Sequence, residues 1–194
     1  MIHNHDRSKW FGASDTAMIM GNWNTKTFEK WWLEKCGVPQ KRIVTKEMVT
    51  GTNMEHRILD FIGCKKRDRQ IRYFPLRLRV NLDGENRHVI SEIKTHSAPR
   101  FKVSKTYWQQ CQVEMFATGL YLRKRKTCQI VAYRVLEEDH INFFSPIEEN
   151  RLSYHPIEYD LEFIEIEYLP RLKYLAKCLR RGAWPDFGEF KRGA

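Results

Sequence analysis

Apolar residues recur at helical spacing in the first third of the chain. Within residues 46–66, Met54, Ile58, Phe61 and Ile62 follow one another at intervals dominated by three and four, which gathers them on one face. A long amphipathic helix is therefore predicted over residues 46–66.

Two shorter helices are predicted ahead of this one. Ser14 and Asp15 are residue types that favour helix N-termini, and Gly21 follows a short stretch of helix-compatible residues. A second helix is predicted over residues 27–36, because Gly37 is well suited to the left-handed conformation that ends many helices.

The period of the pattern then changes from helical to two. Within residues 76–82 every second residue is apolar and the residues between are polar, which is typical of a half-buried strand. Asp83-Gly84 is a common turn dipeptide, and residues 88–95 predict a second strand. The two segments together are expected to form a β-hairpin.

The rest of the chain alternates between the two patterns. The predicted elements are a helix over 104–118 closed by Gly119, strands over 127–135 and 153–159, and a helix over 161–181 followed by Gly182 and Pro185. This order predicts an α/β fold with a central mixed β-sheet flanked by helices. At 194 residues, with no internal repeat or linker, one domain is expected over residues 1–194.

Charge narrows the range of partners. The chain carries 34 Lys and Arg against 24 Asp and Glu, a formal net charge of +10, which suits a polyanion such as nucleic acid. The densest basic run comprises Lys65, Lys66, Arg67, Arg69, Arg72, Arg77 and Arg79. Such a run either lines a phosphate backbone or forms a solvated face, and the sequence leaves both readings open.

The location expected from the sequence is a reducing cytoplasm. No apolar run reaches the length of about 18 residues that spans a membrane, and residues 1–10 lack the apolar core of a signal peptide. The five cysteines are widely spaced without a CxxC pair, so they are expected to be core thiols rather than disulfides or a cysteine-only metal site.

The predicted hairpin carries two acidic residues and a lysine that are expected to lie close together. Glu92 and Lys94 lie two residues apart on one strand and therefore share a face, and the simplest register places Asp83 beside Glu92. Two adjacent carboxylates repel each other unless a cation lies between them. Oxygen ligands, with the carbonyl of Ile93 as a further one, favour Mg²⁺ or Mn²⁺ over zinc.

An acidic residue followed, across a turn, by Glu-x-Lys on a strand is the pattern of the PD-(D/E)xK nucleases. The pattern is weak alone, because exposed strands often carry Glu-x-Lys as a salt-bridging pair. Three other segments add to it: Arg7 with FGASD and its Ser14, GTNMEHRILDFI with its Glu55, and YWQQCQVEMFAT with its Gln110 and Gln112. In this order the four blocks resemble the lambda exonuclease and YqaJ-type viral recombinase nucleases.

The resemblance implies a role for each of these residues. Those implied to ligate metal are Glu55, Asp83, Glu92 and the carbonyl of Ile93, and those implied to act in catalysis include Lys94 and Gln110, with Tyr107 and Gln112 nearby. Arg7 and Ser14 would bind the 5′-phosphate of a DNA end. A helix N-terminus favours an anion, so a position of Ser14 as N-cap supports that assignment.

The implied activity is exonucleolytic digestion of linear double-stranded DNA from the 5′ end. Such an enzyme uses Mg²⁺, with Mn²⁺ as the alternative, in a site of two ions. It would leave 3′ single strands for recombination by strand annealing. The resemblance further implies a ring of three subunits around DNA, a single-strand annealing partner, and a phage or prophage gene in a bacterial host.

Two other classes of function remain open from the residues alone. One is a different PD-(D/E)xK enzyme, either an endonuclease or a CRISPR-associated exonuclease. The other is a DNA-binding module without turnover, which has no need for charges converging like Glu55, Asp83, Glu92 and Lys94. His96 follows Lys94 by two residues, and a structural role is favoured for it over a catalytic one.

Overall fold

The computed structural model describes residues 6–39, 44–122 and 124–193. Its helices are α1 (Thr16–Met20), α2 (Lys26–Lys35), α3 (Lys46–Phe61), α4 (Lys105–Leu122), α5 (Leu169–Arg181) and α6 (Phe187–Gly193). Its strands are β1 (Lys66–Tyr73), β2 (Leu78–Glu85), β3 (Val89–His96), β4 (Thr127–Arg134) and β5 (Leu152–Ile157).

The five strands form one mixed sheet in the order β1-β2-β3-β4-β5. The pairs β1–β2, β2–β3 and β4–β5 are antiparallel, whereas β3 and β4 are parallel. Parallel strands need a crossover connection, and α4 provides it. β3 therefore lies at the centre of the sheet, with the remaining strands on either side of it.

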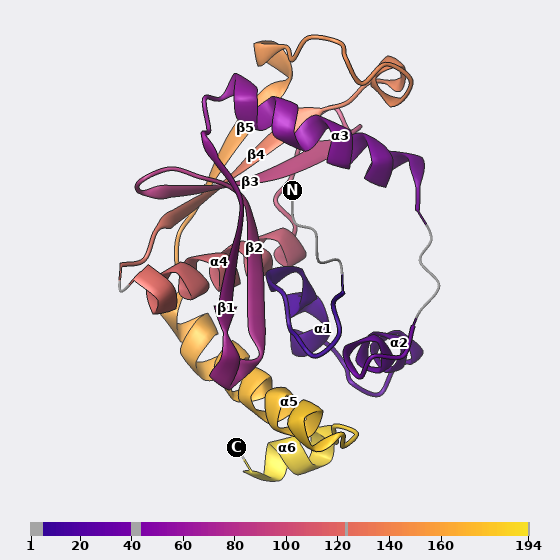
Figure 1. Ribbon diagram of the computed structural model, residues 1–194, viewed down its shortest axis with the longest axis vertical. Coiled ribbons are helices and arrows are strands. Elements are labelled where there is room, and N and C mark those ends of the chain that lie inside the picture. Colours follow the sequence, from indigo (N-terminus) through magenta and orange to yellow (C-terminus); the bar gives the residue numbers. More distant parts are fainter. Residues whose placement is uncertain (1–5, 40–43, 123, 194) are drawn as a thin grey trace.

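Helices cover both faces of the sheet, so the fold has three layers. Met54, Ile58 and Leu59 of α3 pack with Ile93 and Val131 on one face. The other face packs against the buried residues of α4 and of the N- and C-terminal helices, which form a larger core. The predicted α/β fold, a central mixed sheet flanked by helices, is confirmed by this arrangement (Figure 1).

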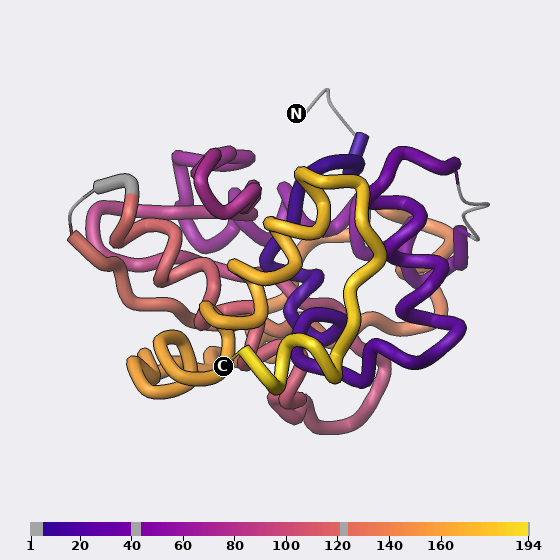
Figure 2. The backbone as a smooth tube through the Cα atoms, turned by 90° about the horizontal axis from the view of Figure 1, so that it is seen from below, coloured from indigo at the N-terminus to yellow at the C-terminus, as the bar shows by residue number. Residues whose placement is uncertain are grey.

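The N- and C-terminal helices meet through a cluster of aromatic rings. Trp23, which follows α1, stacks on Tyr174 of α5 with ring centroids 5.7 Å apart. It also contacts the α6 rings of Phe187 and Phe190 at 5.0 and 5.4 Å. Figure 2 shows the yellow C-terminal segment running across the indigo N-terminal helices. These contacts give α6, which the sequence pattern did not predict, its place in the fold.

The long predicted helix is shorter than expected. It ends at Phe61, and Gly63 turns the chain with a φ of +69°. The following basic run, residues 66–73, forms the edge strand β1. Its charged residues lie on an edge strand with few buried positions, so it lacks the alternating apolar pattern that identifies a half-buried strand.

The predicted turn at Asp83-Gly84 is wrong, because both residues lie within β2. The chain turns instead at Asn86, whose side chain accepts hydrogen bonds from the backbone N–H groups of His88 and Val89. Gly84 is required here for another reason. A Cβ at this position would lie 2.3 Å from Leu59 Cδ2, so the glycine allows α3 to approach the sheet closely.

Two helix ends also differ from their predictions. α4 continues through Gly119 to Leu122, so this glycine does not end the helix. The predicted helix over 161–181 is irregular at its start, where Phe163–Tyr168 forms a π-helical turn before α5 begins. Its predicted end is confirmed, since Gly182 adopts a φ of +63° directly after Arg181.

No cysteine is in a disulfide among the described residues. Four of the five are buried, as predicted for core thiols, and Cys36 at the end of α2 is exposed. Among the described residues, no helix is both long and apolar enough to cross a membrane.

Candidate active site

Acidic side chains from three elements meet at the centre of the sheet. The β2–β3 register pairs Gly84 with Ser91 and Glu85 with Ile90, so the next position brings Asp83 opposite Glu92, as predicted. The backbone N–H of Ile93 donates to Asp83 Oδ2 at 2.9 Å, which fixes that carboxylate. Glu55 approaches from α3, and the negative charges of Glu92 and Glu55 both act on Asp83.

Lys94 and Gln110 form a hydrogen-bonded group with Glu92. Lys94 Nζ donates to Glu92 Oε1 at 2.5 Å, and Gln110 Nε2 donates to the same oxygen at 2.5 Å. Lys94 Nζ also lies 3.4 Å from Gln110 Oε1 and 5.0 Å from the ring centre of Tyr107. The ammonium group is thereby held from three sides, with its position set by β3 and α4.

The local electrostatics reflect an excess of negative charge. Burial, together with the charges of Glu92 and Glu55, raises the pKa of Asp83 well above its usual range. Burial and the charge of Glu92 likewise raise the pKa of Glu55. Burial alone would lower the pKa of Lys94, but the carboxylates of Glu92 and Asp83 outweigh it and raise that pKa. One ammonium group does not neutralise three carboxylates.

The donor set fits a hard divalent cation. Glu92 Oε2 is buried and has no hydrogen-bond partner among the described residues. A buried carboxylate oxygen without a donor is costly unless a cation approaches it. Carboxylate oxygens of Glu55, Asp83 and Glu92, with the Ile93 carbonyl on the same strand, are the ligand type that Mg²⁺ and Mn²⁺ prefer.

The acidic group opens into a pocket of about 350 Å³. The predicted site residues that line this pocket are Arg7, Ser14, Glu55, Asp83, Lys94 and Gln110. The structure thus brings four residues assigned to chemistry and both residues assigned to a 5′-phosphate into one cavity. Glu92 and Ile93 are not among the lining residues. Arg7 and Ser14 come from the N-terminal segment, whereas the other four come from α3, the sheet and α4.

The predicted role of Ser14 as a helix N-cap is wrong. Ser14 lies inside a 3-10 turn, Ala13–Asp15, and its side chain is exposed. The side chain of Asp15 caps this turn instead, by accepting from the N–H of Gly12 at 2.7 Å. Its exposure leaves the Ser14 hydroxyl accessible to a ligand in the pocket.

Asp15 does not make the pocket negative, because its charge is compensated. Lys35 Nζ lies 2.6 Å from Asp15 Oδ2, and both side chains are almost fully buried. Trp31 Nε1 donates to Asp15 Oδ1 at 2.8 Å. This ion pair also ties the N-terminal turn to α2.

Arg79 is a pocket residue that the sequence analysis did not single out. It stands on β2, is buried, and donates through its guanidinium to the backbone carbonyl of Asp6. Burial and the nearby charge of Arg72 lower its pKa, with Arg7 acting in the same direction. The sequence analysis named Arg79 only as a member of a basic run, which it left open as either a phosphate-binding surface or a solvated face.

Asp68 is a second residue that the sequence analysis missed. It lines the pocket beside Glu55, and its carboxylate lies 3.1 Å from His56 Nε2. The nearest ligand atoms of Glu55, His56 and Asp68 lie within 4.8 Å of one another. The sequence signal that could have identified Asp68 is its position as a single acidic residue within a run of basic residues.

The remaining candidates lie outside the pocket lining. Gln112 faces away from the site, where it donates to the carbonyl of Glu158 at 2.7 Å and accepts from the N–H of Asp160 at 2.8 Å. It therefore joins α4 to the segment after β5. His96 packs against Phe101, and burial lowers its pKa, in keeping with the structural role predicted for it.

Comparison with known proteins identifies a solved structure with the same fold. The crystal structure of an alkaline exonuclease (LHK-Exo) from Laribacter hongkongensis superimposes with a TM-score of 0.64 at 19% sequence identity. The match covers 96% of this chain and 94% of that chain. The likeness confirms the predicted α/β fold with its mixed sheet.

A second solved structure, that of SSO0001, has a TM-score of 0.49 at 11% identity and covers 93% of this chain and 78% of that chain. No protein-family model and no curated protein matches the sequence.

Proposed function

We propose that this protein is a metal-dependent deoxyribonuclease of the lambda exonuclease and YqaJ type, which digests linear double-stranded DNA from its 5′ ends. One observation carries the proposal. Residues that the sequence resemblance assigned separately to metal binding, catalysis and end recognition line a single pocket. The fold shared with an alkaline exonuclease supports the same conclusion.

Glu55, Asp83, Glu92 and the Ile93 carbonyl would hold Mg²⁺, with Mn²⁺ as the alternative, in a site of two ions. Bound divalent metal supplies a water of lowered pKa and neutralises charge on the phosphate and the leaving oxygen. The protein's own contribution is to keep these carboxylates close together despite their repulsion. The hydrogen bond from the Ile93 N–H to Asp83 serves that purpose.

Lys94 would carry the positive charge beside the scissile phosphate. Its ammonium is fixed by Glu92 and Gln110, so it is oriented before substrate arrives. A preorganised cation stabilises the negative charge that develops on a phosphate during attack, and it can hold the attacking water by hydrogen bonding. A raised pKa keeps Lys94 protonated for this role at neutral and alkaline pH.

Arg7 and Ser14 would bind the terminal 5′-phosphate in the same pocket. A guanidinium pairs with phosphate through two parallel hydrogen bonds, and an exposed hydroxyl can donate a third. Only a strand end presents such a phosphate, so recognition at this position would select ends and set the polarity of digestion.

The resemblance also supports a wider biological setting for the proposed enzyme. The long 3′ single strands produced by such digestion would be substrates for a single-strand annealing protein in recombination. A ring of three subunits around DNA would retain the substrate between cuts. A phage or prophage gene acting in the cytoplasm of a bacterial host is the expected source.

Digestion of one linear duplex, prepared with 5′-phosphate and with 5′-hydroxyl ends beside a closed circle, tests the proposal. With Mg²⁺ or Mn²⁺, release of nucleotides should be faster from phosphorylated ends, and the circle should stay intact. Cutting of the circle would assign the site to an endonuclease. Tight binding without cleavage would contradict an enzymatic function.

Two substitutions separate chemistry from end recognition. Lys94→Ala should abolish cleavage yet leave the fold and DNA binding largely intact, and a rate close to wild type would refute its assignment. Arg7→Ala should reduce the preference for phosphorylated ends and the processivity of digestion while cleavage continues. An unchanged ratio of the two rates would exclude Arg7 from end recognition.

A further inference from the structure

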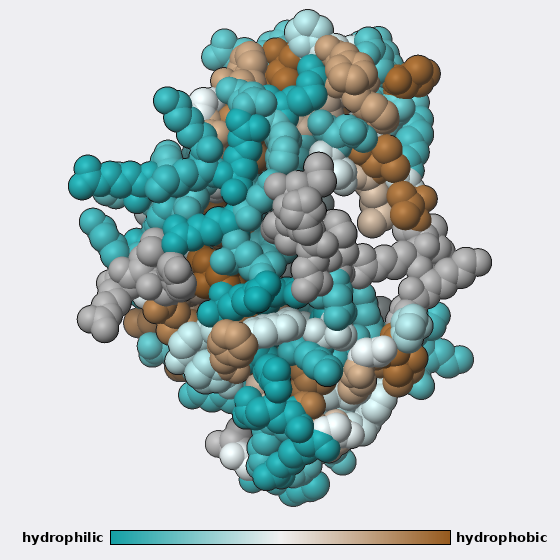
Figure 3. Space-filling model, in the orientation of Figure 1, coloured by the Kyte–Doolittle hydropathy of each residue, from teal (hydrophilic) through white to brown (hydrophobic). Residues whose placement is uncertain are grey.

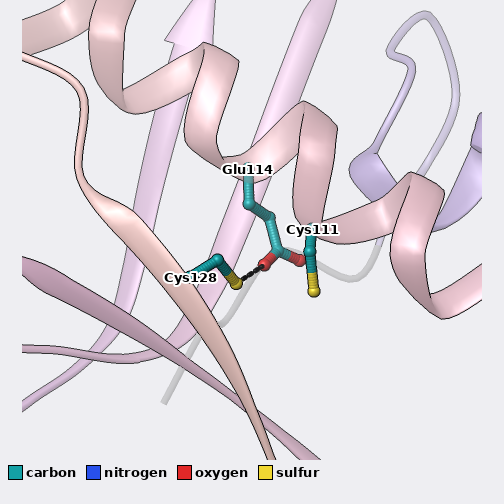
Figure 4. Close-up of side chains that lie close together, drawn as sticks. All are labelled: Cys111, Glu114 and Cys128. Carbon is teal, nitrogen blue, oxygen red and sulfur yellow. Dashed lines mark hydrogen bonds between the residues drawn. The ribbon is translucent and has the colours of Figure 1, made fainter. Parts of the chain in front are cut away.

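A fully buried group of three side chains lies directly beneath the proposed active site. Cys111 and Glu114 stand three residues apart on α4 and therefore share a face, and Cys128 faces them from β4. Figure 4 shows the Glu114 carboxyl group reaching toward the two sulfur atoms. All three side chains are buried, so none of them meets DNA directly.

Each oxygen of Glu114 has a different partner. Oε1 accepts a hydrogen bond from Gln110 Nε2 at 2.9 Å, on the side of the active site. Oε2 lies 3.8 Å from the Cys128 thiol, on the side of the core. Glu114 therefore connects the hydrophobic core with an amide that itself contacts Glu92.

Glu114 acts in this place as a hydrogen-bonding group rather than as a charge. No Lys or Arg forms an ion pair with it in the described part of the chain. Burial, followed by the charge of Glu92, raises its pKa well above the usual range for a carboxyl group. A neutral carboxyl still offers an acceptor oxygen to Gln110.

The Gln110 amide has two ends of opposite character, and its function depends on which end faces Glu92. Nε2 divides its two protons between Glu92 and Glu114, which leaves Oε1 toward the Lys94 ammonium. A rotated amide would place its oxygen against the Glu92 carboxylate and its N–H group toward the ammonium, and both contacts would be repulsive.

We propose that Glu114 is a positioning residue, which holds the Gln110 amide in the one orientation that fixes Glu92 and Lys94 for catalysis. The inference rests on the proposed nuclease function. It gives a function to a residue that is buried away from substrate. Glu114 lies within the block YWQQCQVEMFAT, but the family resemblance assigned no role to it.

Substitution of Glu114 by residues of similar size tests this role. Glu114→Met fills the space but offers no acceptor to the Gln110 amide. It should lower kcat by about tenfold to a hundredfold with little change in KM, because one buried hydrogen bond that orients Gln110 is lost. Glu114→Gln retains an acceptor oxygen and should recover most of that loss. Asp139→Asn, at another buried carboxyl remote from the pocket, controls for stability effects alone.

A double-variant cycle distinguishes positioning from a general effect on folding. If Glu114 acts only through Gln110, then the double variant Gln110→Ala/Glu114→Met should be no slower than Gln110→Ala alone. Multiplication of the two effects would overturn the proposal. So would a kcat for Glu114→Met within about threefold of wild type, since the orientation that Glu114 gives to Gln110 would then have little effect on the rate.

A measurement without DNA keeps this inference separate from the proposed function. The side-chain amide protons of ¹⁵N-labelled Gln110 should exchange slowly with solvent in the wild-type protein and in Glu114→Gln, and faster in Glu114→Met. If the wild-type protein cleaves no DNA, the proposed function fails while this exchange pattern still decides whether Glu114 orients the amide. Equal exchange in all three proteins would overturn the proposal.

Metal analysis of the purified protein tests whether Cys111, Glu114 and Cys128 instead bind a metal ion. Two thiols and a carboxyl whose ligand atoms lie within 4.8 Å also suit a thiophilic ion such as Zn²⁺. Positioning by Glu114 predicts no stoichiometric zinc. One zinc per chain that is lost in Cys128→Ser would make Glu114 a metal ligand and overturn the proposal.

Discussion

Asp83→Asn is expected to stabilise the metal-free protein while it abolishes cleavage. Asn retains an oxygen that can accept from the Ile93 N–H, so the substitution removes the charge with little change in shape. At an effective dielectric constant of about 20, a pair of unit charges about 5 Å apart interacts by roughly 3 kcal/mol. Asp83 loses two such repulsions, from Glu55 and Glu92, and one attraction, to Lys94.

The net gain after relaxation should be about 1–3 kcal/mol, or roughly 2–12 °C in Tm for a chain of this size. The size of this gain depends on pH. The pKa of Asp83 is raised in the folded state, so above its ordinary value of 3.8 the folded state holds a proton that the unfolded state has released. Stability then falls as the pH rises. The difference between variant and wild type should be small near pH 4 and grow toward pH 8.

Thermal unfolding in EDTA, followed by circular dichroism between pH 4 and 8, measures this difference directly. Asp186→Asn is a suitable control, because that exposed carboxylate accepts a hydrogen bond from the Glu189 N–H and its charge is not crowded by other acids. Added Mg²⁺ should stabilise the wild type and favour it over Asp83→Asn, since only the wild type retains the full ligand set. A variant that is no more stable at pH 8, or a difference independent of pH, would refute the reasoning.

Two further predictions concern the scaffold of the site. Lys35→Met should destabilise the fold by about 3–5 kcal/mol, because it leaves the buried Asp15 carboxylate without its cation. Lys46→Met, at an exposed pair, should have a much smaller effect, and urea unfolding of the two variants measures the difference. Gly84→Ala should lower the Tm by several degrees, since its Cβ would overlap Leu59, and an unchanged Tm would show that α3 can move away from the sheet at no cost.

The elements with strong periodicity could be predicted from the sequence. The alternation before Asp83 predicted β2, and the spacing of Met54 and Ile58 predicted α3, because each pattern reflects burial on one face. β1 could not be predicted in this way, since an edge strand rich in Arg buries few side chains. The turn was placed too early because Gly84 serves close packing against Leu59 rather than chain reversal.

The candidate site could likewise be predicted from the sequence only in part. The sequence brought Asp83 beside Glu92 because a hairpin register is a local property, and the structure has that register. The presence of Arg7 and Gln110 in the same pocket came only from the family resemblance, since no spacing rule connects an N-terminal segment with α4. Asp68 was missed because it faces the pocket from β1, an edge strand that the sequence pattern did not predict. Arg79 was named only as part of a basic run, because its burial depends on the N-terminal segment that contacts it.

The parallel pairing of β3 with β4 has a consequence for how the protein becomes active during its synthesis. The hairpin that carries Asp83, Glu92 and Lys94 leaves the ribosome before α4 and β4 do. Until the crossover is complete, Gln110 is absent and β3 has no neighbour on one side, so the acidic residues lie on an open, unsupported edge. A chain still being translated would therefore hold the three carboxylates without the helix that orders them. If the protein is the proposed nuclease, its site would be complete only once the fold is nearly finished.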